Sequence, residues 1–325
     1  MGDGVPGGGQ AVIGAKAAAR PLGRSSSTGA AHRPRISLTP YWFILPALLV
    51  LAVFVVGPVA WSFWVSFHEY QWNMPAFGMP FVGLRNYADL PRDEDLVRSV
   101  GWTASFAAIS VPIGLVMGFV LALLLNSRVL GRRTRSVLRG VFLLPMMLAA
   151  VVAGFMWRML FDPEYGPVNH LLSLVGVSPV SWFSEVTAAR TAVVVAELWL
   201  TTPFVALVLL AGLQGIPEDV YEAGRIDGAS GFQLFSQITL PLLRTSVAIV
   251  LVIRTMDALR VFDLVFVLTN GGPGTVTTTI MYYDYLYAFQ YFQMGLASAF
   301  SFAILLVIAL ITIGYLMLLR RADRE

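Results

Sequence analysis

The sequence predicts an all-α membrane protein with six transmembrane helices. Hydrophobic residues make up 57% of its 325 residues, charged residues only 13%, and the mean hydropathy is +0.73. A soluble domain carries about twice that share of charged residues. Apolar runs of about 20 residues recur, and each is long enough to cross a hydrocarbon core of about 30 Å as a helix. The runs are continuous rather than alternating, so we do not expect the strands of a membrane barrel.

We place the six spans at residues 41–67, 99–125, 138–161, 190–213, 243–268 and 292–319. Five prolines fall inside them: Pro46, Pro58, Pro112, Pro145 and Pro203. Transmembrane helices tolerate proline because neighbouring groups satisfy the freed backbone carbonyls. A functional kink is possible at each, but we expect local packing to accommodate them.

A hydrophilic segment, residues 1–40, precedes the first span. It is rich in Gly, Ala, Ser and Arg and has almost no large apolar residues, so it cannot build a core and is predicted to be a disordered cytoplasmic tail. Its length, and that of the first span, argue against a cleaved signal peptide. The expected organisation is therefore the tail at 1–40, a six-helix transmembrane domain at 41–320 and a short cytoplasmic tail at 321–325.

The placement of arginine and lysine predicts the orientation of the spans. Fifteen basic residues lie in the two tails and in the loops after the second and fourth spans. The loops on the other side hold four, Arg85, Arg92, Arg98 and Arg190, among several acidic residues. Because an excess of basic residues marks the cytoplasmic side, we expect both termini to be cytoplasmic.

The cytoplasmic loop between the fourth and fifth spans, residues 214–241, is predicted to be a helix–turn–helix at the membrane surface. Pro217 suits the first helical position, and the acidic residues Glu218 and Asp219 suit the positive end of the helix dipole. We expect this helix to run to about Ile226. A turn follows at 227–231, where glycines allow positive φ, and a second short helix starts at Phe232.

Two features of this loop indicate an interface. Val220, Ala223 and Gly224 would form a small face that lets a neighbouring surface approach closely. Three aromatic residues would form an exposed apolar patch, which usually marks a binding surface: Tyr221, Phe232 and Phe235. The alternative is an ordinary amphipathic connector between two spans.

The spacing of the loop residues resembles the EAA loop in the membrane subunits of binding-protein-dependent ABC importers. The matching residues are Glu222-Ala223, Gly228 six positions after the glutamate, and Ile238-x-Leu240-Pro241. Further segments are similar to carbohydrate-type permeases of the maltose, trehalose and glycerol-phosphate group: FVGLRNY at 81–87, DLVFVLTNGGP at 263–273, DPEYGPVN at 162–169, Pro145 and Trp157. One position departs from the family, because Gly224 stands where alanine is usual, at a cost in helix stability of about 1 kcal/mol.

The resemblance spans about residues 40–320 and implies the type I ABC importer permease fold, in the plasma (inner) membrane of a prokaryote. It implies as partners a second, similar permease subunit, two copies of an ABC ATPase and an extracytoplasmic solute-binding protein. In that family the loop glutamate, here Glu222, contacts the ATPase, and the glycine, here Gly228, makes the turn. Around these positions we expect eight ATPase-coupling residues: Glu218, Tyr221, Glu222, Ala223, Gly224, Asp227, Gly228 and Phe232. We expect this chain to bind no cofactor, with ATP and Mg²⁺ held by the partner ATPase.

Several other chemistries are not expected of this chain. It has no GxxxxGK[ST] phosphate loop, so it cannot bind ATP in the P-loop manner. It has no cysteine, three histidines and neither an HExxH nor a GxSxG motif, so we expect neither an enzyme nor a metal site. Its basic residues lie in short scattered clusters, which argues against nucleic-acid binding.

Four charged residues lie in the fifth span at intervals of three positions: Arg254, Asp257, Arg260 and Asp263. Charges near the bilayer midplane are costly and usually face a bundle interior or a watery cavity. They could form a self-neutralising ladder packed against a partner subunit, or line a path that hydrogen-bonds substrate hydroxyls. For the second case we assign six candidate path residues: Glu197, Trp199, Arg254, Asp257, Arg260 and Asn270. In a secondary transporter the same charges would bind protons or sodium.

An aromatic segment follows at residues 277–289, with Tyr282, Tyr283, Tyr285 and Tyr287. We expect an aromatic belt at the outer membrane interface, or alternatively a short helix that contacts the binding protein or gates the outer mouth. Another short surface helix is expected at 170–175.

These observations favour a permease subunit of an ATP-driven importer of a sugar or sugar-like solute, which works by alternating access. The alternative is an ion-coupled secondary solute carrier. That class predicts an inverted repeat between the chain halves, and the sequence shows no convincing one. A scaffold for membrane assembly would leave the buried charges unexplained.

Overall fold

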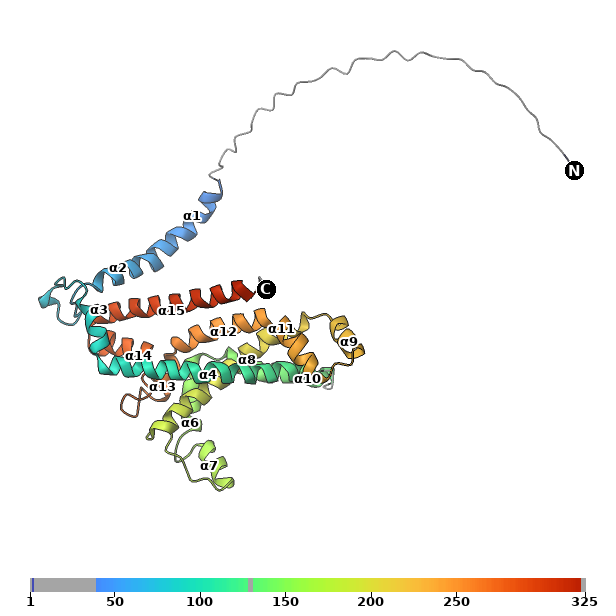
Figure 1. The fold of residues 1–325 in the computed structure, drawn as a ribbon. Coiled ribbons are helices and arrows are strands. Elements are labelled where there is room, and N and C mark those ends of the chain that lie inside the picture. The colour runs from blue at the N-terminus through green and yellow to red at the C-terminus, as the bar shows by residue number, and fades with distance from the viewer. Residues whose placement is uncertain (1, 3–38, 128–130, 323–325) are drawn as a thin grey trace, which may run out of the picture. The chain divides into compact units, whose positions relative to one another are not determined.

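The computed structural model describes residue 2 and residues 39–127 and 131–322 of the chain (Figure 1). In this described part, β structure is confined to two isolated bridges, His68 with Phe81 and Gln71 with Gln293, and the elements are helices. The contacts divide the chain into two compact units, Met1–Ala52 and Val53–Glu325. The predicted tails lie outside the described residues, apart from residues 2, 39 and 40 of the first and 321 and 322 of the second.

The first predicted span is helical but not uniform. It comprises α1 (Thr39–Leu51), the π-helical η1 (Ala52–Val56) and α2 (Gly57–Val65). Pro58 lies in the first turn of α2 and lacks the N–H that would bond to a carbonyl one turn earlier. A π-helical turn is a common adjustment of the hydrogen-bond ladder at such a position.

Two long helices, α4 (Glu94–Asn126) and α8 (Val186–Gln214), lie side by side in the second unit (Figure 1). Their contact is close because glycines face it. A Cβ added at Gly118 would lie 2.4 Å from Cγ1 of Val205, and one added at Gly114 would lie 3.4 Å from Cδ2 of Leu198. Small residues allow transmembrane helices to approach in this way. Pro112 and Pro203 lie inside these helices without breaking them, as expected.

The third predicted span is not one continuous helix. The 3-10 turn η4 (Pro145–Met147) separates α5 (Arg132–Leu143) from α6 (Ala150–Leu160), and the two arms are bent by 102°. Leu148 is extended, with φ −80° and ψ 142°. Proline cannot continue the helical hydrogen bonds, so at Pro145 the outcome is a kink and the expectation of local packing was wrong.

The fifth predicted span is also broken. It comprises α12 (Arg244–Leu259) and α13 (Asp263–Leu268), and between them Phe262 leaves the helical region with φ −133°. Before α12 lie four short helical segments: α9 (Glu218–Ile226), α10 (Gly231–Gln233), the π-helical η5 (Leu234–Thr239) and α11 (Leu240–Leu242). The stretch from Gly231 to Leu242 meets α12 at a bend of 64°.

The last long helix is α15 (Met294–Ala322). Short helices complete the second unit: η2 (Pro75–Phe77), α3 (Arg85–Asp89), η3 (Leu90–Arg92), α7 (Pro167–Leu174), α14 (Ile280–Tyr285) and the π-helical η6 (Leu286–Gln290). The helix α7 confirms the short helix expected near 170–175. By length and composition, four helices of the described chain could cross a membrane, or up to six if each of two bent pairs is one span. The all-helical prediction is confirmed, and the count of six spans stays a prediction.

Candidate functional site

The 214–241 loop folds as a helix–turn–helix, as predicted. Pro217 is the N-cap of α9, with φ −60° and ψ 140°, so the helix begins one residue later than expected. It ends at Ile226, and Gly228 follows with φ 81°, a left-handed conformation that glycine adopts without strain. The Gly228 N–H donates to the Arg225 carbonyl at 3.1 Å, which closes the helix end.

The two arms of the loop pack on each other. A Cβ added at Gly224 would lie 2.7 Å from Cδ2 of Leu234 and 3.0 Å from Cδ1 of Ile238. Across the same contact, the Tyr221 and Thr239 hydroxyls are 3.0 Å apart. Gly224 therefore admits side chains of η5 and braces the loop internally, whereas the sequence placed it on a face left open for a partner.

A capping box fixes the start of the second arm. The N–H of Ser230 donates to Oε1 of Gln233 at 2.7 Å, and the Ser230 hydroxyl accepts from the Gln233 N–H at 3.4 Å. This reciprocal pair satisfies two backbone donors at a helix start. Together with the Gly224 contact, it makes the loop a folded unit rather than a loose connector.

The outward surface of the loop carries most of the expected coupling residues. Phe232 is 77% exposed and Ile226, which the sequence did not single out, is 85% exposed. The others on this surface are exposed as well: Glu218, Glu222, Ala223, Asp227 and Gly228. The apolar patch expected from Tyr221, Phe232 and Phe235 is wrong for two members. Tyr221 is half-buried, and Phe235 packs edge-on against Phe119 with ring centroids 5.4 Å apart.

A buried ion pair joins α8 to α12. Nη2 of Arg254 lies 2.9 Å from Oε1 of Glu197, and the two side chains are only 2% and 7% exposed. Nη1 of Arg254 lies 3.8 Å from Oδ2 of Asp257, and Oδ1 of Asp257 lies 3.9 Å from Nη2 of Arg260. The side chains of Asp257 and Arg260 are about half exposed. The structure thus connects four of the six predicted path residues in one charged network.

The predicted ladder along the fifth span stops at Arg260. The Arg254–Asp257 and Asp257–Arg260 neighbours are confirmed, but α12 ends at Leu259 and Asp263 begins a new helix. Asp263 forms no ion pair within the described residues. The buried end of the network is completed by Glu197 on another helix.

Trp199 and Asn270 are not joined to this network. The Trp199 ring meets Trp157 edge-on at 5.8 Å, and Trp157 stacks on Phe161 at 5.0 Å. Asn270 is exposed with φ 52°, and its Oδ1 accepts a hydrogen bond of 2.8 Å from the Tyr282 hydroxyl. No hydrogen bond or ion pair in the described chain links either residue to the four charged ones.

Comparison with known proteins gives the family. Residues 110–324, more than half of the chain, match the family described as binding-protein-dependent transport system inner membrane component. The trehalose/maltose transport system permease protein MalF of Thermococcus litoralis is 43% identical over 279 residues, 85% of this chain and 92% of that protein. The chain belongs to this permease family.

Other relatives and a solved structure agree with this assignment. The sulfoquinovosyl glycerol transport system permease protein SmoG of Agrobacterium fabrum is 35% identical, covering 86% of this permease and 90% of that protein. The trehalose transport system permease protein SugA of Mycobacterium tuberculosis is 31% identical, covering 86% and 87%. A chain of a bacterial ABC transporter involved in alginate import superimposes with a TM-score of 0.76 at 25% identity, covering 87% of this permease and 95% of that chain.

Family membership decides between the expected functions. The permease is a membrane component of an ABC importer and not an enzyme, and ATP hydrolysis belongs to a separate subunit. The ion-coupled carrier, which the charged fifth span alone left open, is the weaker interpretation. The structure also has the ABC permease fold, as the loop motif implied.

Sequence reasoning missed a polar cluster at the start of α4. Asp93 is the N-cap of this helix and accepts from the Leu96 N–H at 3.0 Å, the Tyr283 hydroxyl at 2.5 Å and the Tyr287 hydroxyl at 2.7 Å. Burial acts to raise the pKa of Asp93, but these hydrogen bonds outweigh it and hold the pKa below its usual range. An acidic residue just before a long helix is a recognisable cap, but its tyrosine partners are nearly 200 positions away.

Two of the four tyrosines of the aromatic segment are not available to a belt at the membrane interface. Tyr282 and Tyr283 are buried, at 2% and 4% exposure, and they belong to the packed core. Burial raises the pKa of both phenols, and the Asp93 carboxylate beside Tyr283 adds to the rise there. The alternative expectation was a short helix, and α14 is one. The contacts of these tyrosines fix α14 to α4.

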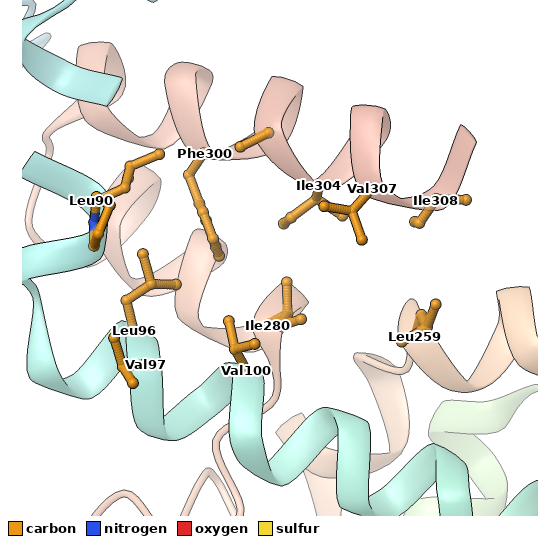
Figure 2. Close-up of a pocket in the computed structure, with 12 residues that line it drawn as sticks. Leu90, Leu96, Val97, Val100, Leu259, Ile280, Phe300, Ile304, Val307 and Ile308 are labelled. Atoms are coloured by element: carbon orange, nitrogen blue, oxygen red, sulfur yellow. The ribbon is translucent and has the colours of Figure 1, made fainter. Parts of the chain in front are cut away.

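A separate hollow of about 300 Å³ lies between α4 and α15 (Figure 2). Its lining is entirely apolar: Leu90, Pro91, Leu96, Val97, Val100, Leu259, Ile280, Phe300, Ala303, Ile304, Val307 and Ile308. Such a surface offers no donor or acceptor side chain to a hydroxylated solute. We therefore do not assign it to the transport path of the permease.

Proposed function

We propose that this permease imports a sugar or sugar-like solute across a prokaryotic inner membrane, with six spans and both termini in the cytoplasm. The names of three relatives support the solute class, since they specify trehalose/maltose, trehalose and sulfoquinovosyl glycerol transport. The distribution of arginine supports the orientation. Four helices of the described chain are long and apolar enough to cross a membrane, or up to six with the two bent pairs, which supports six crossings.

The proposed partners are a second permease subunit, two ABC ATPase subunits and an extracytoplasmic solute-binding protein. ATP and Mg²⁺ would be held by the ATPase. Its docking surface on this chain is the outward face of the 214–241 loop, where Glu222, Ala223 and Phe232 are exposed. An exposed apolar ring on a loop has the character of an interface, where aromatic anchors supply most of the binding energy.

The observation that carries the transport path is the charge balance at Asp257. The buried Arg254 is already paired with Glu197 at 2.9 Å, so it is not available to solute. Asp257 lies farther from both arginines, at 3.8 and 3.9 Å, and it is half exposed. Its oxygens can therefore accept hydrogen bonds from solute hydroxyls, while Arg254 and Arg260 lie on either side of it.

The remaining path residues have supporting roles in this proposal. Arg260 is 58% exposed and can donate to solute oxygens. Trp199, which rests against Trp157, supplies an aromatic face of the kind that sugar sites use. Glu197 and Arg254 position Asp257 without touching solute, and Asn270 belongs to the outer end of the path.

Alternating access follows if the loop moves as a unit with the ATPase. ATP binding closes the ATPase dimer, and the braced loop carries α11 and α12 with it. The path near Asp257 would open to the outside, where the binding protein releases solute, and ATP hydrolysis would reset the cycle. A ligand shifts such an equilibrium only through its different affinities for the two states. Coupling therefore depends on the loop staying docked.

Coupling is tested with Glu222→Lys in the purified complex reconstituted into vesicles. We expect assembly to be unchanged and solute-stimulated ATP hydrolysis to fall more than tenfold, because the charge on the docking face is reversed. Glu164→Lys, which reverses an exposed charge in another loop, is the matched control and should behave as wild type. Normal stimulation in the Glu222→Lys complex would contradict the assigned docking surface.

The path is tested with Asp257→Asn in an uptake assay that uses trehalose and maltose. We expect the apparent affinity or the preference between the two sugars to change, with assembly and basal ATPase activity intact. Asp263→Asn is the control, because Asp263 lies six positions away and outside the charged network. A variant that only fails to assemble would favour the structural ladder, and uptake without any ATPase subunit would overturn the proposed function.

A further inference from the structure

A half-buried carboxylate without a counter-charge lies away from the charged network. Asp284, in α14, accepts a hydrogen bond of 2.5 Å from the Ser301 hydroxyl through Oδ2, while its Oδ1 is buried and has no hydrogen-bond partner. No basic side chain of the described residues lies within ion-pair distance of it. Burial raises the pKa of Asp284 to about 6, and the Ser301 hydrogen bond opposes this only in part. The group is therefore mostly ionised at neutral pH.

This carboxylate lines a hollow of about 260 Å³ between α2, α14–η6 and α15. The walls are aromatic and hydroxyl-bearing: Trp61, Tyr70 and Phe289, with Ser62, Ser298 and Ser301. Trp61 and Phe289 are more than half exposed, so their rings are accessible from outside the packed core. Buried polar atoms usually have a hydrogen-bond partner, and the Asp284 carboxylate lines a hollow large enough to admit one.

The chemistry of the hollow selects among ligands. A neutral hydroxyl would satisfy Oδ1 but would leave the negative charge of this half-buried carboxylate without a counter-charge. Calcium needs six to eight oxygen ligands and magnesium six, whereas Asp284 is the only carboxylate in the lining. An ammonium group supplies both a donor and a positive charge, and aromatic rings add cation–π attraction.

The hollow lies at one end of two apolar stretches. Trp61 and Ser62 are close to the end of the candidate span Trp42–Val65, and Met294, also in the lining, begins the candidate span Met294–Tyr315. At 1.5 Å per residue, Ser301 is about 10 Å along α15 from that end. This depth is close to the head-group region of a bilayer, where tryptophan and tyrosine gather. The cations available there are the amines of lipid head groups.

We propose that the Asp284 hollow binds a primary ammonium group supplied by phosphatidylethanolamine, in the leaflet where α2 ends and α15 begins. The carboxylate provides the counter-charge and accepts a hydrogen bond through Oδ1, and the aromatic walls shield the ammonium from water. The acyl chains stay in the bilayer. The site is separate from the 214–241 loop and from the Glu197–Arg254 pair, and it does not depend on the solute transported.

The test uses the complete importer complex, equilibrated with vesicles of equal phosphatidylethanolamine and phosphatidylglycerol content and then analysed by native mass spectrometry. Wild type should retain phosphatidylethanolamine in preference to phosphatidylglycerol, and Asp284→Asn should lose that preference by about tenfold. Ser301→Ala, which keeps the carboxylate, should preserve it. Asp95→Asn removes an exposed acidic charge that pairs with Arg98, and it should have no effect.

Two further measurements identify the group that binds and the molecule that supplies it. Retention by wild type should fall severalfold between pH 7.5 and pH 5, as the carboxyl takes up a proton, and Asp284→Asn should show no such change. Tyr70 is the only other titratable side chain in the lining, and α2 and α15 contribute none. Equal retention of both lipids by wild type and Asp284→Asn would overturn the proposal. Binding of free ethanolamine but not of the lipid would also overturn it. So would an Asp284→Asn complex that loses a partner subunit while its lipid retention is unchanged.

Discussion

Removing one member of the Glu197–Arg254 pair should destabilise the permease far more than removing both. The two side chains are nearly inaccessible to solvent, so Arg254→Met leaves the Glu197 carboxylate buried without its cation. Glu197→Leu leaves the Arg254 guanidinium with only the more distant Asp257, at 3.8 Å. The double variant Glu197→Leu/Arg254→Met buries neither charge.

The size of the effect follows from the geometry. At the N–O separation of 2.9 Å the Coulomb attraction is about 6 kcal/mol for an effective dielectric constant of about 20. Burying the two ions costs several kcal/mol each, so the net contribution of the pair is small. Breaking such a pair by one substitution costs about 3–5 kcal/mol, whereas replacing both partners by apolar residues is often close to neutral. We expect each single variant to melt on the order of 10 °C below wild type, and the double variant within a few degrees of it.

The assay is thermal unfolding of the purified complex in lipid nanodiscs, arranged as a double-mutant cycle. A coupling energy of about 2 kcal/mol or more between the two positions is the expected result. If the single variants melt with wild type, or if the double variant loses the sum of the two single losses, the reasoning from buried charge is refuted.

Three more predictions concern packing, pH and the loop. Gly118→Ala should lower stability by about 1–3 kcal/mol, because the new Cβ would lie 2.4 Å from Val205. The control Gly101→Ala, on the same helix, meets nothing within 4 Å and should raise stability by up to about 1 kcal/mol. Thermal unfolding compares the two variants. Asp93→Asn should cost about 1–2 kcal/mol at pH 7. Because the folded pKa of Asp93 is lowered, its stabilisation is complete above the unfolded value of about 4 and is lost as the pH falls through the folded value. The gap to wild type should therefore narrow steadily below about pH 4, and a constant gap would contradict the cap. Phe235→Ala should lower the melting temperature, because its ring packs on Phe119. Phe232→Ala should leave the melting temperature unchanged but weaken ATPase binding in a pull-down. The reverse pattern would make Phe232 the packing residue and Phe235 the docking residue.

Local patterns predicted the helices and the loop because their causes are local. The acidic first turn of α9, its end at Ile226 and the positive φ of Gly228 follow from neighbouring residues. The all-helical class follows from the length of the apolar runs. Where the sequence failed on the fold, the presence of a proline did not by itself decide the outcome. Pro145 breaks the third span, whereas Pro112 and Pro203 lie within continuous helices.

The site was predicted less completely because its contacts join distant segments. The i,i+3 spacing revealed the pairs Arg254–Asp257 and Asp257–Arg260, but the strongest contact of Arg254 is with Glu197, 57 positions away. The inner position of Gly224 depends on Leu234 and Ile238 folding back over α9. The Asp284 hollow likewise arises from three elements that approach each other only in the folded chain.

The fit of Gly118 against Val205 limits how this permease can change shape. With no free space between them, α4 and α8 cannot slide past one another without a wholesale repacking of their shared surface. Spin labels on these two helices should therefore report a fixed separation throughout a turnover cycle. The helix breaks after Leu143 and Leu259 lack regular helical hydrogen bonds and are the natural hinges. Spin labels placed on either side of each break should show a change in separation during turnover.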